Sequence, residues 1–199
     1  KSVVGAAGTL PWSFSFAISP VPNGQTSPTT INGMGSMVSA PISWTNLIPG
    51  LTYTVSETSV SGWGQVLTCT GVTDIDGNTS NNSVTFQAGT GSISCTATNT
   101  ALPTTIQVVK TTVGGTGTFD FTVTPADVTG LSVTTTAPGT VTASTVKSGL
   151  VAGTLYTVAE NNPGAGWTAG TVDCSVVRAD STTAQGLGAS FTALPGAAF

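Results

Sequence analysis

Charged residues are scarce in this sequence. Only 6% of the 199 residues are Asp, Glu, Lys or Arg, whereas a typical globular protein has about 25%. The net charge is −4, and the four Lys and Arg residues form no cluster. A protein that binds nucleic acid needs grouped basic side chains to replace the counterions of the phosphates. The composition therefore argues against a nucleic-acid partner.

Catalytic signatures are also missing. The sequence has no histidine, no serine paired with a base, and no segment in which carboxylates cluster. The glycine-rich run at residues 114–117 lacks the lysine and the helix that a phosphate-binding loop requires. We therefore expect neither enzymatic activity nor a cofactor.

Long apolar runs do not occur either. No stretch approaches the ~20 residues of a transmembrane helix, and no signal peptide is visible. We therefore expect no membrane insertion. A surface rich in Thr, Ser and Asn with little charge is better suited to a secreted protein than to a crowded cytoplasm, so the sequence favours an extracellular or cell-surface location.

What the sequence does contain is a pattern of short strands. Apolar and polar residues alternate with a period of two in several runs that are rich in β-branched and aromatic residues and are bounded by Gly, Pro or Asn. The clearest runs are residues 12–16, 52–55, 119–123 and 155–158. Strict alternation indicates one buried and one exposed face. The sequence predicts an all-β protein of antiparallel, immunoglobulin-like β-sandwiches.

An internal repeat is the strongest signal in the sequence. Five segments of the first half recur about 105 residues later: 1–9 at 110–118, 47–57 at 150–160, Gly62-Trp63 at Gly166-Trp167, Cys69 at Cys174, and 86–91 at 191–196. We therefore expect two tandem modules, residues 1–103 and 104–199, with the short joint at residues 100–105.

The alignment of the two copies also predicts a gap. Phe199 aligns with Ser94, so module two is expected to lack the counterpart of the last strand of module one. Either the chain is a segment of a longer array, or a strand from the next subunit fills the open edge and makes a filament. Both explanations imply self-association or neighbouring repeats as partners.

The ordered motifs resemble a known family. A lysine on the first strand, a Tyr-Thr-Val-x-Glu strand, a Gly-Trp pair and a last strand ending in Thr-Asn-Thr are similar to the prealbumin-like repeats of bacterial surface proteins, namely the collagen-adhesin B-type and SpaA-like pilin domains. The resemblance covers nearly the whole chain, twice. The tryptophan and the cysteine pair depart from the usual family pattern.

The resemblance implies an intramolecular isopeptide bond in each module. Module one would join Lys1 to Asn99 with the help of Glu57. Module two would use Lys110 and Glu160, and its asparagine would lie beyond the end of the sequence. The alternative is that these are solvated strand charges. Against this alternative, both Glu residues of the chain share one repeat position and two of its three Lys residues share another.

The three cysteines point to the same compartment. Cys69 and Cys95 lie in one module, and we expect them to form a disulfide in an oxidising environment. Cys174 would be unpaired, or paired with a neighbouring subunit. The alternative is three buried free thiols.

One segment has oxygen ligands at alternate positions, as calcium loops do: Asp74, Asp76 and Asn78. It lacks the closing glutamate, and Asp-Gly between strands is first of all a turn. A calcium site here is the weaker interpretation, and we expect no metal.

Two functions follow from these observations. The first is a structural repeat of a bacterial fibre, pilus or adhesin stalk, which duplication favours. The second is an adhesive module that binds a ligand, for which the non-repeated segment 20–39, expected to be a loop, is the best location.

Overall fold

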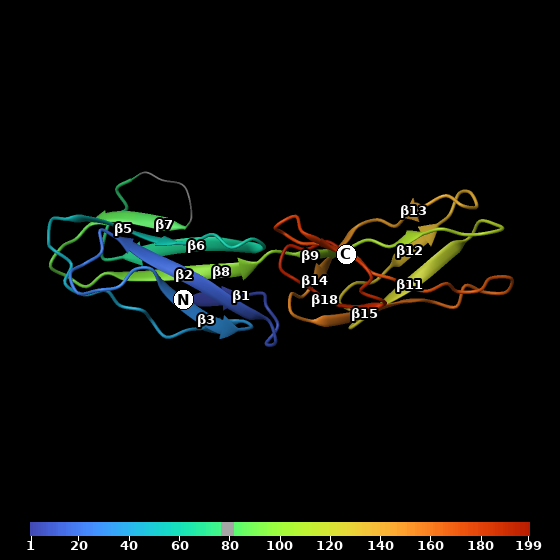
Figure 1. The fold of residues 1–199 in the computed structure, drawn as a ribbon, viewed down its shortest axis with the longest axis horizontal. Coiled ribbons are helices and arrows are strands. Elements are labelled where there is room, and N and C mark those ends of the chain that lie inside the picture. The colour runs from blue at the N-terminus through green and yellow to red at the C-terminus, as the bar shows by residue number, and fades with distance from the viewer. Residues whose placement is uncertain (77–81) are drawn as a thin grey trace. The chain divides into compact units, whose positions relative to one another are not determined.

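The computed structural model describes residues 1–76 and 82–199, and all its regular elements are strands. The chain divides into two compact units, Lys1–Ala101 and Leu102–Phe199. Each unit is described below by itself (Figure 1).

Unit 1 is a sandwich of two four-stranded sheets. Its strands are β1 (Ser2–Val4), β2 (Pro11–Ser19), β3 (Thr29–Met34), β4 (Met37–Val38), β5 (Thr52–Glu57), β6 (Trp63–Thr70), β7 (Ser83–Gln87) and β8 (Ser94–Ala101). One sheet has the order β3-β2-β5-β7 and the other the order β4-β1-β8-β6. The first strand, β1, and the last, β8, are parallel neighbours, whereas the other strand pairs are antiparallel.

The core of unit 1 lies between these sheets. Trp12, Phe14, Phe16 and Ile18 are the buried residues of β2, and they alternate with more exposed neighbours. This is the period-two pattern of a strand with one buried face. The Phe14 ring meets the edge of Trp63 at the start of β6, with the ring centroids 5.3 Å apart, so the two sheets pack directly on each other.

Unit 2 repeats the first of these sheets closely. Its strands are β9 (Thr104–Ile106), β10 (Val109–Lys110), β11 (Thr118–Thr124), β12 (Leu131–Thr134), β13 (Thr142–Ala143), β14 (Lys147–Leu150), β15 (Leu155–Glu160), β16 (Val176–Val177), β17 (Thr183–Ala184) and β18 (Ser190–Thr192). The four-stranded sheet β12-β11-β15-β18 corresponds to β3-β2-β5-β7. The other strands form three two-stranded pairs: β10-β13, β14-β9 and β16-β17.

Equivalent side chains make equivalent contacts in the two units. The hydroxyl of Tyr53 accepts a hydrogen bond from the amide of Ile48, and the hydroxyl of Tyr156 accepts one from the amide of Val151, at 3.1 and 2.9 Å. The repeated Gly-Trp pair has a backbone cause, because Gly62 and Gly166 have φ angles of 84° and 87°, a region that side chains other than glycine seldom adopt. The repeat in the sequence is thus a repeat in conformation.

One expectation is corrected by the structure. The prediction that residues 20–39 form a loop is wrong, because β3 and β4 lie within this segment and β3 pairs with β2 over six residues. Every residue of β3 is partly or fully exposed, so this edge strand has no alternating apolar pattern to reveal it.

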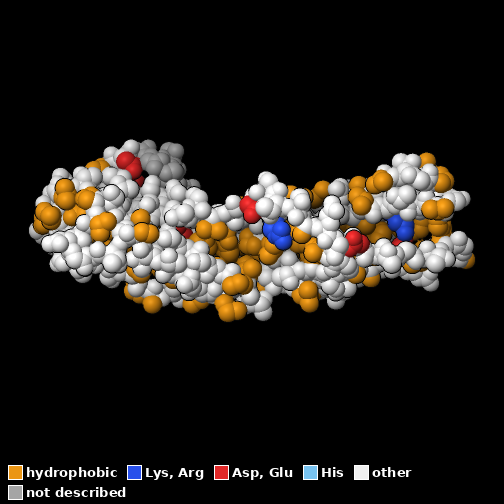
Figure 2. Space-filling view, viewed as in Figure 1, with side chains coloured by type: hydrophobic (Ala, Val, Ile, Leu, Met, Phe, Trp, Pro, Cys, Tyr) orange, Lys and Arg blue, Asp and Glu red, His pale blue; other side chains and the backbone are white. Residues whose placement is uncertain are grey.

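The surface matches the composition, since Figure 2 shows few charged side chains on the face that it draws.

Candidate cross-link sites

The predicted cross-link residues of unit 1 meet inside its sandwich. Val3 of β1 is paired with Asn99 of β8, which places Lys1, two residues earlier, beside the Asn99 side chain. The Lys1 Nζ donates a hydrogen bond to Asn99 Oδ1 and lies 3.5 Å from Glu57 Oε1. The side chains of Lys1 and Glu57 are 1% and 0% exposed, and Asn99 is completely buried. The structure therefore brings all three residues together away from water.

Aromatic rings form the floor of this site. The Lys1 Nζ lies 4.2 Å from the ring centroid of Phe14 and 6.0 Å from that of Phe16. Trp63 meets Phe14 edge-on. Their alternation in the sequence predicts only core residues, although the recurrence of Phe-x-Phe at residues 14–16 and 119–121 is a usable signal for the site. The rings attract the ammonium through their faces and replace the water that would otherwise solvate it.

Burial changes the acid–base properties of the lysine. It lowers the pKa of Lys1 from 10.5 to about 8, because the charged ammonium loses its hydration, and the nearby Glu57 carboxylate offsets only part of this effect. At pH 8 about half of the Lys1 side chains are then neutral, whereas an ordinary lysine is about 0.3% neutral at that pH. The site thus favours a nucleophilic amine.

Several polar atoms of this site have no hydrogen bond. Among the described residues, the buried side-chain atoms that have no hydrogen-bond partner are Glu57 Oε1, Glu57 Oε2 and Asn99 Nδ2, of which Glu57 Oε1 keeps its ion pair with Lys1. A buried polar atom without a hydrogen bond costs about 1–3 kcal/mol, so this cluster requires an explanation. They are the leaving group and the carboxyl group that an amine–carboxamide condensation would use.

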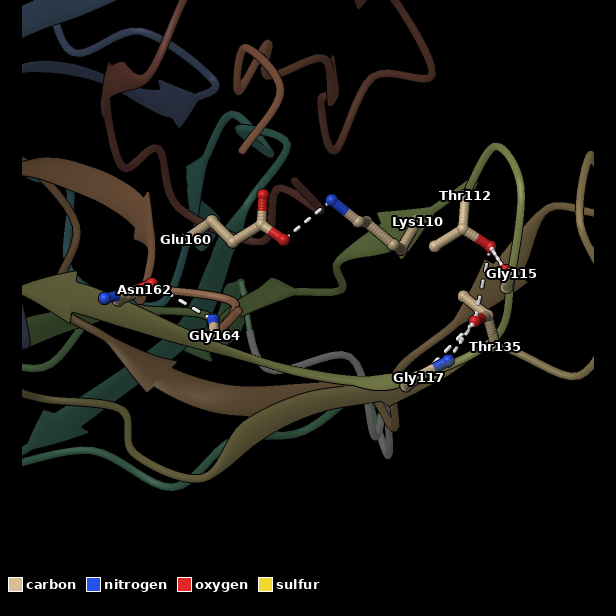
Figure 3. A network of polar contacts seen from close by, with 8 residues as sticks. All are labelled: Lys110, Thr112, Gly115, Gly117, Thr135, Glu160, Asn162 and Gly164. Atoms are coloured by element: carbon tan, nitrogen blue, oxygen red, sulfur yellow. Dashed lines mark hydrogen bonds and ion pairs between the residues drawn. The ribbon is translucent and has the colours of Figure 1, made fainter. Parts of the chain in front are cut away.

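Unit 2 has the same arrangement around its lysine. The Lys110 Nζ donates to Glu160 Oε1 at 2.7 Å, and their side chains are 16% and 5% exposed. The Nζ lies 4.7 Å from the ring centroid of Phe119, which Trp167 meets edge-on at 5.0 Å. Figure 3 shows the Lys110 and Glu160 side chains pointing toward one another. The second site thus has the amine, the carboxylate and the aromatic floor.

The turn after Lys110 is fixed by buried hydroxyl groups. Thr112 Oγ1 donates to the Gly115 carbonyl at 2.7 Å, and the Gly117 amide donates to Thr135 Oγ1 at 3.0 Å (Figure 3). Thr112 and Thr135 are both 3% exposed. These bonds hold the chain between β10 and β11 and therefore keep Lys110 at a defined place above Phe119.

The cysteines of the two units differ: unit 1 has a disulfide and unit 2 has a free cysteine. Cys69 of β6 and Cys95 of β8 are directly paired residues and form a disulfide. Cys174 is a free, partly buried cysteine that packs against the core of unit 2. Burial raises the pKa of the Cys174 thiol, and Asp173 adds to this effect.

The weaker calcium hypothesis gains no support. Asp74 Oδ1 accepts a hydrogen bond from the Thr85 amide at 3.1 Å, and Asn78 lies outside the described residues. Within residues 1–76 and 82–199, no three His, Cys, Asp or Glu side chains are grouped so as to hold a metal ion. The described chain likewise contains no helix of sufficient length and hydrophobicity to cross a membrane.

Comparison with known proteins agrees with this description. The model of a family described as the prealbumin-like fold domain of the SpaA type matches residues 1–101 and again residues 106–199. The chain belongs to this family. No curated protein matches the chain. The first match spans the whole of unit 1 and the second lies within unit 2, so the chain consists of two tandem prealbumin-like domains.

Proposed function

We propose that this chain is a non-enzymatic structural repeat of an extracellular bacterial fibre, pilus or adhesin stalk. Its membership of the SpaA-type family, in two tandem copies, supports a role as a spacer, since repeated modules build length. The Cys69–Cys95 disulfide is consistent with an oxidising compartment. In this role the partners are neighbouring repeats or further copies of the chain.

The observation that carries the proposal is the buried contact of Lys1 with Asn99 and Glu57. A covalent bond inside each module suits a stalk, because a pulling force is then carried by the covalent bond and does not unfold the module. We infer that Lys1 and Asn99 condense once, during maturation, to an isopeptide bond.

The chemistry follows from the groups present. Glu57 takes a proton from the Lys1 ammonium, and the neutral Nζ attacks the Cγ of Asn99. Glu57 gives this proton to the departing Nδ2, the Cγ–Nδ2 bond breaks and ammonia leaves. The new amide nitrogen loses one more proton, which Glu57 accepts. Glu57 ends as a neutral acid.

Intact mass spectrometry tests this proposal. After reduction of the disulfide, the folded protein should weigh about 17 Da less than its sequence, the mass of one ammonia. Peptide mapping should place the loss between Lys1 and Asn99. Lys1→Ala and Asn99→Ala should each restore the full mass, and Glu57→Ala should prevent or greatly slow the loss.

Lys147→Ala is the matched control, since Lys147 is the remaining lysine and lies on β14 of the other unit. This variant should keep the lower mass. A folded protein with its full sequence mass would rule the cross-link out.

A further inference from the structure

The last strand of unit 1, β8, has small side chains on its inner face. Its sequence is Ser-Cys-Thr-Ala-Thr-Asn-Thr-Ala, in which Ala97 and Asn99 are buried and Cys95 is half-buried. Its outward residues are serine and threonine at alternate positions, which resemble one another. A strand without distinct inward side chains is prone to slip along its neighbours, whereas large side chains such as those of β2 fix one register. Packing alone therefore specifies the register of β8 weakly.

The candidate amide bond requires a single register of this strand. Asn99 is paired with Gln65 of β6 on one side and with Val3 of β1 on the other. A slip of one residue would turn Asn99 to the outer face of the sheet. A slip of two residues would keep it inside but would move it by about 6.6 Å along the strand. Only the observed register brings the carboxamide into contact with the Lys1 amine.

The site does not hold Asn99 in this register by itself. Asn99 Nδ2 and Glu57 Oε2 are buried without hydrogen bonds, and a buried polar group without a partner is destabilising. The neighbouring strand β1 pairs with β8 over only three residues. Before the amide forms, another constraint must therefore keep Asn99 beside Lys1.

Such a constraint lies four residues earlier on the same strand. Cys95 is on the same face of β8 as Asn99, because their separation is even. Its disulfide joins it to Cys69, the residue directly opposite on β6. A covalent bond between directly opposite residues allows β8 only one register against β6.

We propose that the Cys69–Cys95 disulfide is a positioning element for the cross-link of unit 1, which fixes the register of β8 and thereby delivers Asn99 to Lys1. This inference rests on the proposed function, because it concerns the rate of the same amide bond. The two cysteines touch none of the reacting atoms in this role and act only through the placement of Asn99.

The order of the two covalent steps follows from this role. The thiols of Cys69 and Cys95 are first oxidised to the disulfide by a small-molecule disulfide, which is reduced to two thiols. Lys1 Nζ then attacks Asn99 Cγ and ammonia leaves. In a reducing compartment the first step does not occur, so β8 is free to slip and the amide forms slowly. The disulfide thus couples the irreversible bond to an oxidising compartment.

The rate of ammonia loss tests the proposal on the complete 199-residue protein. Protein refolded at low pH, either oxidised or reduced, is transferred to a buffer near pH 8, and its mass is followed over time. Samples are compared only if they have the circular dichroism of the folded chain. Reductant, or Cys69→Ser with Cys95→Ser, should lower the rate by on the order of tenfold or more. Cys174→Ser is the matched control and should leave the rate unchanged.

Two engineered disulfides separate register from stability, each placed in the Cys69→Ser, Cys95→Ser background. Thr68 and Thr96 are exposed and directly opposite, so Thr68→Cys with Thr96→Cys should close a disulfide in the native register. Thr68→Cys with Thr98→Cys encloses a loop of nearly the same length, but these positions become opposite only after a slip of two residues. The first pair should restore the fast rate, and the second should not.

The outcomes distinguish this proposal from the cross-link itself. Equal rates in folded oxidised and folded reduced protein would overturn the positioning role and leave the cross-link standing. Equal restoration by the two engineered pairs would also overturn it, because stabilisation alone would then explain the effect. A protein that loses no ammonia in either redox state would refute the cross-link and, with it, this role of the disulfide.

Discussion

At the scale of single residues, the feature that matters is a lysine and a glutamate that form an ion pair in an apolar site. Lys1 and Glu57 are both buried, and the two rings of Phe14 and Phe16 lie under the ammonium. Both charged forms are costly there. Moving the proton from Lys1 to Glu57 removes both charges at once, and it also creates the nucleophile and the acid that the condensation needs.

The lowered pKa of Lys1 gives the proposed reaction its pH dependence. Burial lowers this pKa to about 8, so the fraction of neutral, nucleophilic amine rises with pH up to about 8 and then levels off. We therefore expect the rate of ammonia loss to rise by about tenfold per pH unit below pH 8 and to level off above it. An exposed lysine would instead react faster up to its ordinary pKa near 10.4.

The measurement starts from protein that is folded without the cross-link. Inclusion bodies dissolved in denaturant can be refolded at pH 5 and transferred to buffers between pH 6 and pH 10, with mass recorded against time. The Glu57→Gln variant is the control and should remain unreacted throughout. A rate that keeps rising to pH 10 would show that burial does not lower the pKa of Lys1.

At the scale of strands, β8 is the central element of unit 1. It pairs with β6 over eight residues and with β1 over three. Cys95 bonds it to β6, and Asn99 contacts Lys1 ahead of β1. One strand thus carries both candidate covalent links, one to each neighbour.

We expect the disulfide to contribute measurably to the stability of unit 1. Its sequence separation is 26 residues, for which the loop-closure model gives about 3.5 kcal/mol. In the Asn99→Ala background, where no amide competes, adding reductant should lower the free energy of unfolding of unit 1 by about that amount in denaturant titrations.

The variant that also carries Cys69→Ser and Cys95→Ser is the control, and its stability should not respond to reductant. If the stability of the Asn99→Ala protein also does not respond to reductant, Cys69 and Cys95 do not form a disulfide in solution.

The sequence predicts the strands in which apolar and polar residues alternate, and it does not predict the strands that lack this alternation. Residues 12–16 and 119–123 have one buried face, and both are strands as expected. The edge strand β3 is partly exposed along its length, so nothing in its pattern separates it from a loop. Residues 167–175 align with β6 of unit 1 but form no strand. Strand pairing depends on a neighbouring segment, which the local sequence pattern does not encode.

The family resemblance predicts the candidate sites, and the rarity of charge in the sequence supports them. Lys1, Glu57, Lys110 and Glu160 stand out in a chain with 6% charged residues. The aromatic floor did not stand out, since Phe14 and Phe119 read equally well as ordinary core residues. Only the packing shows that these rings lie against an ammonium.

At the scale of the whole molecule, the cross-link would decide how the chain responds to force. Lys1 and Asn99 are 98 residues apart in sequence, and an amide between them would remove nearly all of unit 1 from the path of tension. Released residues extend by about 3.6 Å each, so unfolding of unit 1 in the absence of the amide should add on the order of 300 Å of length.

Single-molecule force spectroscopy with handles at both ends should therefore show no extension step from unit 1 in the natural protein. Lys1→Ala should restore the step under reducing conditions, and Lys147→Ala should not. Equal extension of the natural protein and the Lys1→Ala variant would mean that tension passes through the strands of unit 1.

The central place of β8 also has a consequence in time. It is the last strand of unit 1 along the chain, yet it lies between β1 and β6. A polypeptide emerges with its N-terminal end first, so this sheet stays divided until residue 101 has appeared. Lys1 therefore cannot contact Asn99 until the whole domain has been synthesised. The proposed amide bond of unit 1 could therefore form only after the whole of that unit has been synthesised, so its presence would mark a completed domain.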